Sequence, residues 1–361
     1  MDFSLPDLLA DLRSLIECES PSGDAAAVAR SADMVARLGT RLLGAAPDRF
    51  GPAHLRWQFG DTPRVLLLGH HDTVWPLGSL ATHPWSIDDG VLRGPGCFDM
   101  KAGLVMALHA VAAQPDRAGV TVLVTGDEEI GSPTSRELIE STAEGCLAVL
   151  VLEASAGGGA LKTERKGASN YLVRATGRAA HAGLEPERGV NASIELAHHL
   201  LAVSALGDPA RGTTVTPTVL SAGTTTNTVP AAGEFAIDVR ARSAAEQQRV
   251  DTALHALQPV LPGARLTVTG GPNRPPLSIE SSADLYDRAV KVAAALGQQP
   301  PGRAAVGGAS DGNFTAGIGV PTLDGLGAIG GGAHAEDEHV LVDTLPGRTA
   351  LVAALVEDLL G

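Results

Sequence analysis

Three short apolar runs, separated by stretches with helical spacing, most constrain what this chain can fold into. The runs are Val65–Leu68, Val120–Val124 and Leu147–Leu152, and the helical stretches between them are Lys101–Ala113 and Ser135–Thr142. Buried strands that alternate with helices are typical of an α/β unit. The sequence therefore predicts an α/β domain with a mostly parallel central sheet.

The pattern changes in the middle of the chain. A strand at 170–175, a helix at 191–204, strands at 214–220 and 234–240, a helix at 244–257 and a strand at 265–269 follow one another. This β-α-β-β-α-β order is typical of a ferredoxin-like α+β domain. We expect residues 1–167 and 275–361 to form one α/β domain, interrupted by an inserted domain at 168–274.

Composition narrows the classes of function. The chain has 27 basic and 41 acidic residues, and a formal net charge of −14 disfavours nucleic acids and anionic membranes as partners. Its N-terminal stretch carries acids where a secretory signal has bases, and no apolar run reaches the roughly 18 residues of a membrane span. Three scattered cysteines argue against a disulfide framework. We expect a cytoplasmic protein.

Polar residues follow each apolar run at the point where the strand ends. His70, His71 and Asp72 follow the first run, Asp127, Glu128 and Glu129 follow the second, and Glu153 follows the third. Open α/β sheets bind ligands outside the carboxyl ends of their strands. His70 and Asp72 share one side of the chain, so Asp72 is either a turn residue or a carboxylate that holds the second ring nitrogen of His70. His71 points the other way and is expected to pack.

Two further residues become candidates by position. Asp99 ends a loop rich in glycine and proline just before a helix, where it is either a helix cap or a ligand. His334 follows the glycine run Gly330–Gly332.

Together these motifs resemble the dinuclear zinc exopeptidases, the family of glutamate carboxypeptidase, aminoacylase, acetylornithine deacetylase and succinyl-diaminopimelate desuccinylase. The motifs occur in the family's order: His70-His71-Asp72, Gly94–Lys101, Asp127–Ser132, Glu153 and His334. The resemblance spans nearly the whole chain and is strongest for the glutamate carboxypeptidase branch. It implies a two-zinc catalytic domain and an inserted lid domain through which two copies form a homodimer.

The resemblance also implies the role of each residue. Asp99 bridges two Zn²⁺ ions, His70 and Glu153 complete one site, and Glu129 and His334 complete the other. Glu128 is the general base that takes a proton from the attacking water, and Asp72 supports His70. Nitrogen and oxygen ligands suit Zn²⁺, with Mn²⁺ or Co²⁺ as substitutes. The resemblance further implies a cis peptide bond between Asp99 and Met100.

Four residues of the inserted domain match the family as well. His181 is implied to donate to the oxyanion of the tetrahedral intermediate, from its own subunit or from a partner subunit. Asn227, Arg240 and Arg274 are implied to hold a substrate carboxylate, a task that suits the planar guanidinium group. Asp238 offers an alternative, in which Arg240 forms a structural ion pair.

We predict a metal-dependent exopeptidase that releases a C-terminal, glutamate-like amino acid from a small peptide. An N-acyl-amino-acid deacylase is the alternative within the family. Two other classes stay open: a serine hydrolase that uses Ser310, within the G-x-S-x-G match at 308–312, with Asp324 and His334, and an inactive metal- or peptide-binding protein. Glu128 argues against a pure binder, which needs no carboxylate beside the ligands.

Overall fold

The structure is a computed structural model that describes residues 2–361, and the chain divides into two compact units. Unit 1 comprises the residues up to Arg165, Leu277–Val306 and Ser310–Gly361, and unit 2 comprises Lys166–Pro276 with Gly307–Ala309. These divisions lie close to the domain boundaries at 167/168 and 274/275 that the sequence predicts.

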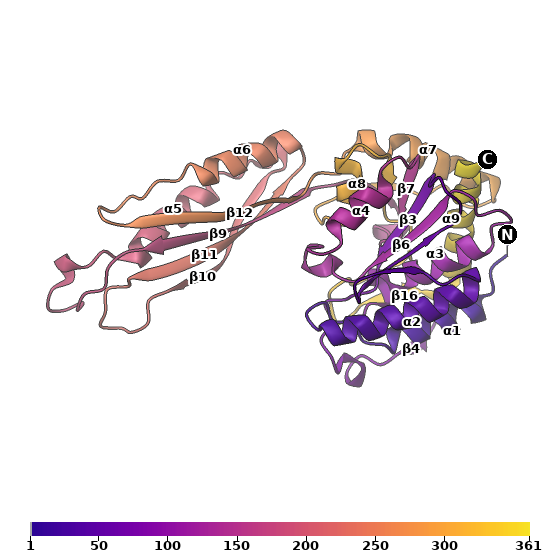
Figure 1. Ribbon diagram of the computed structural model, residues 1–361, viewed down its shortest axis with the longest axis horizontal. Coiled ribbons are helices and arrows are strands. Elements are labelled where there is room, and N and C mark those ends of the chain that lie inside the picture. The colour runs from indigo at the N-terminus through magenta and orange to yellow at the C-terminus, as the bar shows by residue number, and fades with distance from the viewer. Residues whose placement is uncertain (1) are drawn as a thin grey trace. The chain divides into compact units, whose positions relative to one another are not determined.

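The central sheet of unit 1 has six strands (Figure 1). Their spatial order is β1 (Asp48–Phe50), β2 (His54–Gln58), β6 (Val120–Thr125), β3 (Val65–His70), β7 (Ala148–Val151) and β14 (Thr322–Leu323). Strand β3 runs parallel to β6 and β7, and β14 runs parallel to β7. Strand β2 runs antiparallel to both of its neighbours, β6 and β1. The predicted α/β fold with a mostly parallel central sheet is confirmed.

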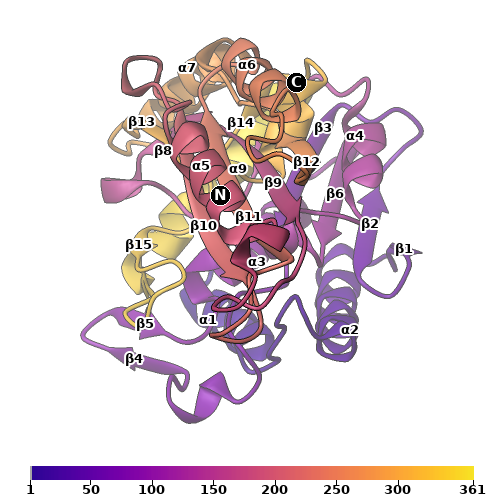
Figure 2. The same cartoon turned by 90° about the vertical axis from the view of Figure 1, so that its left-hand side faces the viewer.

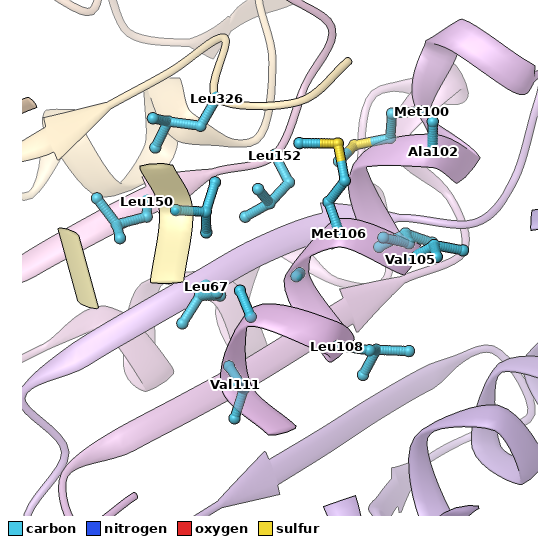
Figure 3. Close-up of a cluster of buried hydrophobic side chains, with 14 of the residues drawn as sticks. Leu67, Met100, Ala102, Val105, Met106, Leu108, Val111, Leu150, Leu152 and Leu326 are labelled. Atoms are coloured by element: carbon cyan, nitrogen blue, oxygen red, sulfur yellow. The ribbon is translucent and has the colours of Figure 1, made fainter. Parts of the chain in front are cut away.

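Helices cover both faces of this sheet, which is why β3, β6 and β7 are buried along their whole length. One face contributes Leu67 and Leu150 to a core that includes helices α1 (Leu5–Ile16), α2 (Ala25–Leu43), α3 (Ala102–Ala112), α7 (Ile279–Ala295) and α9 (Leu345–Leu360). Figure 3 shows Met100 and Met106 beside Leu152 in this core. The other face packs Leu66 and Leu68 with side chains from α4 (Arg136–Ala143) and α8 (Gly312–Gly317).

Two small sheets of unit 1 are not predicted from the sequence, because five of their six strands have only two to four residues and the sixth buries the polar residues Thr163 and Arg165. One has the order β15 (Gly330–Gly331), β16 (His339–Leu341), β5 (Val91–Arg93) and β4 (Ser86–Asp88). The other pairs β13 (Arg303–Val306) with β8 (Leu161–Arg165). Since β16 pairs with β5, the segment that carries His334 lies beside the chain that leads to Asp99.

Unit 2 has one four-stranded antiparallel sheet and two main helices. The sheet order is β10 (Thr214–Ala222), β11 (Ala232–Ala241), β9 (Gly167–Thr176) and β12 (Arg265–Arg274). Helix α5 (Ala192–Ser204) lies along β10 and β11, as Figure 2 shows, and α6 (Ala244–His255) packs on β12 and β11. The order along the chain is the β-α-β-β-α-β order that the sequence predicts.

One face of the unit 2 sheet is buried. Tyr171, Val173 and Ala175 of β9 form a core with Leu196 of α5 and Val250 of α6, while the residues between them on β9 face away. Across residues 2–361, no helix combines the length and the apolar character that crossing a bilayer requires.

Candidate metal centre

The carboxyl ends of β3, β6 and β7 deliver polar side chains to one edge of the central sheet. His70 is the last residue of β3, Glu128 and Glu129 begin a short 3-10 turn just after β6, and Glu153 follows β7. Because the three strands are parallel, their ends lie side by side. This arrangement is the one that the sequence predicts.

Asp99 and His334 reach the same edge from loops. Asp99 lies in an irregular segment before α3, and its peptide bond to Met100 is cis, as the resemblance implies. The alternative that Asp99 caps α3 is wrong, because α3 begins after Lys101 and has no side-chain cap. His334 has a left-handed backbone (φ 63°) and lies between β15 and β16.

The five candidate ligands form two groups that share Asp99. Nε2 of His70 lies 3.4 Å from Oδ1 of Asp99 and 3.3 Å from Oε1 of Glu153. Nε2 of His334 lies 3.3 Å from Oδ2 of Asp99 and 3.1 Å from Oε2 of Glu129. Asp99 therefore presents one oxygen to each group, which is the geometry of a bridging ligand.

The unsatisfied polar atoms of this cluster indicate that it is built for cations. Nε2 of His70, Oδ1 of Asp99 and Oε1 of Glu129 are buried side-chain atoms without a hydrogen-bond partner. Buried polar atoms are rarely left without partners, and here three of them belong to one cluster. Imidazole nitrogens and carboxylate oxygens are also the ligands that Zn²⁺ prefers. The residues present therefore fit a pair of divalent cations.

The carboxylates make the cluster strongly negative. Although burial favours neutral imidazole, the nearby carboxylates of Asp72, Asp99 and Glu153 raise the pKa of His70 well above its usual value. Hydrogen bonds to Asp99 and Glu129 likewise raise the pKa of His334 to about 10. Burial raises the pKa of Glu129, against the influence of His334. The raised pKa of His334 shows that this cluster favours bound positive charge, which a proton or a metal ion can supply.

Asp72 supports the site differently from the prediction. Nδ1 of His70 lies 3.0 Å from the backbone carbonyl oxygen of Asp72 and 3.4 Å from its carboxylate. The carboxylate instead accepts hydrogen bonds from Oγ of Ser22 at 2.6 Å and from the backbone amides of Glu128 and Glu129 at 3.2 Å each. Asp72 therefore orients His70 through its carbonyl group and fixes the turn of Glu128 and Glu129 through its side chain.

Glu128 lies beside the ligands. Its Oε2 atom is 4.0 Å from Nε2 of His70, and ligand atoms of Glu128, His70 and Glu153 all lie within 4.8 Å of one another. Glu128 is buried, and its backbone amide is held by Asp72. This position suits a group that exchanges protons with a molecule at the metal centre.

Arg165 is a residue of the site that the sequence analysis missed. Its Nη2 atom donates to Oε2 of Glu153 at 3.2 Å, and its guanidinium group also donates to Asp324. Lys162 lies farther from Glu153, at 4.0 Å. The sequence does not indicate that Arg165 contacts Glu153, because no motif or spacing shows that β8 lies close to the metal centre.

The serine hydrolase alternative is wrong. Oγ of Ser310 is buried and donates to the carboxylate of Asp324 at 2.6 Å. His334, the base that this mechanism requires, contacts Asp99 and Glu129. Ser310 is therefore tied into the interior of unit 1, away from the histidine that would have to activate it.

Among the candidates in unit 2, His181 has a defined ring orientation. The backbone amides of Gly183 and Leu184 both donate to its Nδ1 atom at 3.1 Å. Since Nδ1 accepts, the proton of the neutral ring is on Nε2. His181 therefore presents a hydrogen-bond donor on an exposed loop.

The other three candidates of unit 2 differ in their surroundings. The backbone carbonyl oxygen of Asn227 accepts a hydrogen bond from the backbone amide of Ala182, which places the loop of Asn227 beside that of His181. Arg240 pairs with Asp238 at 2.8 Å, as the structural alternative expects. Arg274 is buried at the end of β12.

The chain is similar to known proteins over nearly its whole length. Residues 66–358 match the sequence profile of Peptidase family M20/M25/M40. Carboxypeptidase G2 of Pseudomonas sp. (strain RS-16) is 31% identical over 377 residues, which cover 98% of this chain and 89% of that protein. Succinyl-diaminopimelate desuccinylase of Rhodospirillum centenum (strain ATCC 51521 / SW) is 29% identical over an alignment that covers 98% of this chain and 97% of that protein.

Among solved structures, the YXEP protein of Bacillus subtilis, described as a dinuclear metal-binding peptidase of the M20 family, has the same fold. The superposition has a TM-score of 0.68 at 14% sequence identity, and it covers 98% of this chain and 97% of that protein. These matches confirm the resemblance that the motifs predict.

Proposed function

Because the chain belongs to Peptidase family M20/M25/M40, we propose that it is a two-metal carboxypeptidase that hydrolyses the amide bond to a C-terminal, glutamate-like amino acid. The observation that carries this proposal is the pair of ligand groups that share Asp99, with the carboxylate of Glu128 beside them. The match to carboxypeptidase G2 supports the carboxypeptidase activity.

His70, Asp99 and Glu153 would hold one cation, and Asp99, Glu129 and His334 the other. We propose zinc for both, with Mn²⁺ or Co²⁺ as substitutes; the description of the YXEP protein supports a dinuclear site. When bound, a pair of such ions lowers the pKa of water and polarises the carbonyl group to be cleaved.

Glu128 moves the proton. Its side chain accepts the proton of the attacking water and passes it to the nitrogen of the leaving amino acid. Asp72 holds the Glu128 backbone, so the carboxylate is oriented before substrate binds.

Unit 2 supplies groups for the substrate. The Nε2–H of His181 donates to the oxyanion of the tetrahedral intermediate, and its orientation by Gly183 and Leu184 supports this role. Arg274 and Asn227 bind the carboxylate of the substrate. For Arg240 the ion pair with Asp238 favours a structural role.

The outer edge of unit 2 supports a homodimer. Strand β10 is an edge strand, and it exposes Val219 (69%) and Leu220 (57%), while the neighbouring helix α5 exposes Leu201 (73%). Unpaired strand edges with apolar side chains are surfaces that a second copy can cover. Sedimentation velocity of the wild type and of Val219→Lys tests this dimer. A cytoplasmic location stays a prediction from the sequence.

Replacement of Glu128 by Gln tests the mechanism. We expect turnover to fall by about 10²–10⁴-fold because the base is lost, while the metal content stays unchanged. Glu137→Gln, on the exposed surface of α4, is the control. Unchanged turnover in Glu128→Gln would refute the role of Glu128, whereas a wild type that binds metal but has no turnover would favour the inactive binding protein.

A panel of substrates separates the carboxypeptidase from the second candidate. The match to the desuccinylase supports an N-acyl-amino-acid deacylase. Metal-loaded protein is incubated with dipeptides that end in different amino acids and with N-acyl amino acids, with and without a chelator. Chelator-sensitive release of glutamate from dipeptides supports the proposal, and cleavage restricted to N-acyl substrates supports the deacylase.

A further inference from the structure

A buried carboxylate outside the ligand set holds the loop that carries Asp99. Glu338 is 3% exposed and lies four residues after His334. Its Oε1 atom accepts hydrogen bonds from the backbone amides of Phe98 and Asp99, both at 2.9 Å. Its Oε2 atom accepts from the amide of Gly96 at 2.9 Å and from Nε1 of Trp75 at 2.6 Å. The sequence analysis did not identify this residue.

These four hydrogen bonds use the full capacity of the Glu338 side chain. An ionised carboxylate has about four lone-pair sites, and each of the four contacts is a donor. No oxygen of Glu338 is therefore left to serve as a further metal ligand. Glutamine has the same size but only one oxygen, and its NH₂ group would face N–H groups where acceptance is required.

The contacts act on the backbone from which Asp99 reaches the centre. The amide of Asp99 is itself one of the donors, and the amides of Gly96 and Phe98 belong to the turn just before it. The turn is also tight, because a Cβ atom on Gly96 would lie 2.4 Å from Cγ2 of Thr73. Glu338 and Thr73 together restrict the path of this segment.

The same short hairpin segment also supplies a ligand. His334 and Glu338 both lie between β15 and β16, where the amide of Glu338 bonds to the carbonyl oxygen of Ala335. One turn of chain therefore places His334 next to Asp99 and fixes the backbone of Asp99 through Glu338.

We propose that Glu338 is a positioning residue, which sets the backbone of the shared ligand Asp99 and thereby determines the affinity for both metal ions. This inference rests on the proposed two-metal function. Because Asp99 is the one ligand common to both groups, loss of Glu338 weakens both sites together. Loss of a residue that supports a ligand of only one group would instead weaken only that site.

The test compares Glu338→Gln with Glu336→Gln, a change of the same charge at an exposed position of the same segment. Zinc affinity is measured by competition with a chromophoric chelator, and the visible spectrum of the cobalt-loaded protein reports the ligand geometry. We expect Glu338→Gln to bind both ions about 10–100-fold more weakly, with an altered cobalt spectrum, and Glu336→Gln to match the wild type. Unchanged affinity for either ion in Glu338→Gln would overturn the proposal.

A milder variant covers the case in which Glu338→Gln does not fold, as judged by circular dichroism. Trp75→Phe removes one of the four donors, and we expect about two- to tenfold weaker binding of both ions. Unchanged binding in Trp75→Phe would then overturn the inference. Failure of the proposed function is distinct, because the wild type itself would then bind fewer than two ions.

Discussion

The guanidinium group of Arg165 donates two hydrogen bonds to the buried carboxylate of Asp324, at 2.7 and 3.0 Å. We expect Arg165→Met to lower the free energy of unfolding by about 3–5 kcal/mol, because Asp324 then stays buried without its cation. Urea unfolding of the metal-free protein measures this change.

The control for Arg165 is an exposed pair of unit 1. Arg288 and Asp358 lie 2.7 Å apart with both side chains partly in solvent, so Arg288→Met should change the free energy of unfolding by less than about 1 kcal/mol. Equal effects of the two substitutions would contradict the importance of burial at Arg165.

Gly103 allows helix α3 to approach the end of strand β7. A Cβ atom on Gly103 would lie 1.9 Å from the carbonyl oxygen of Leu152, the residue before Glu153. Alanine normally favours a helix over glycine by about 1 kcal/mol, but here we expect Gly103→Ala to destabilise the protein by about 1–3 kcal/mol. It should also weaken metal binding, because Glu153 is displaced.

Thermal unfolding and zinc titration check Gly103→Ala against Gly157→Ala. A Cβ atom on Gly157 would have no neighbour within 4 Å among the described residues, and the backbone there is not left-handed, so this replacement should be neutral. A stabilised Gly103→Ala protein would show that α3 can move away without consequence.

The lowered pKa of Glu246 leads us to expect that the stability of unit 2 depends on pH. Hydrogen bonds from Arg249 and Arg211 lower the pKa of Glu246 to about 2 from its ordinary 4.5. Since the pKa is lower in the folded state, the stabilisation is complete above about pH 4.5 and is lost as the pH falls towards 2.

Hydrogen exchange of the buried strand amides of unit 2, measured from pH 6 to pH 2, tests the role of Glu246. Protection in the wild type should exceed that in Glu246→Gln at pH 6, and the difference should shrink below pH 4.5. Glu187→Gln, at an exposed site, should behave as the wild type does. A difference that does not vary with pH would count against the ion pairs.

We expect replacement of His181 to impair catalysis without affecting metal binding. If its Nε2–H stabilises the oxyanion, His181→Ala should lower kcat by about 10²–10³-fold with little change in KM or in zinc content. His198→Ala, on the exposed side of α5, is the control. Loss of zinc in His181→Ala would point to a structural effect.

The central sheet and the meeting of His70, Glu129 and Glu153 at one of its edges were predictable from the local pattern of the sequence, whereas the ligand roles of Asp99 and His334, which lie on loops, were implied only by the family resemblance. His70, Glu129 and Glu153 follow apolar runs that can only be buried strands, and parallel strands bring such residues to one edge. The supports were not predictable. Arg165 reaches the centre from β8, whose buried positions include polar residues, and Glu338 reaches it from the β15–β16 hairpin, whose strands have only two and three residues. The backbone carbonyl of Asp72, which holds His70, has no sequence signature either.

The order of the ligands along the chain has a consequence for biosynthesis. His70, Asp99, Glu129 and Glu153 all precede unit 2, whereas His334 and the edge strand β14 follow it. When the ribosome has just added Pro276, the nascent chain therefore contains all three candidate ligands of one group, but only two of the three candidate ligands of the other. The second half of the centre, together with Glu338 that holds its shared ligand, can form only after the whole inserted unit has been synthesised.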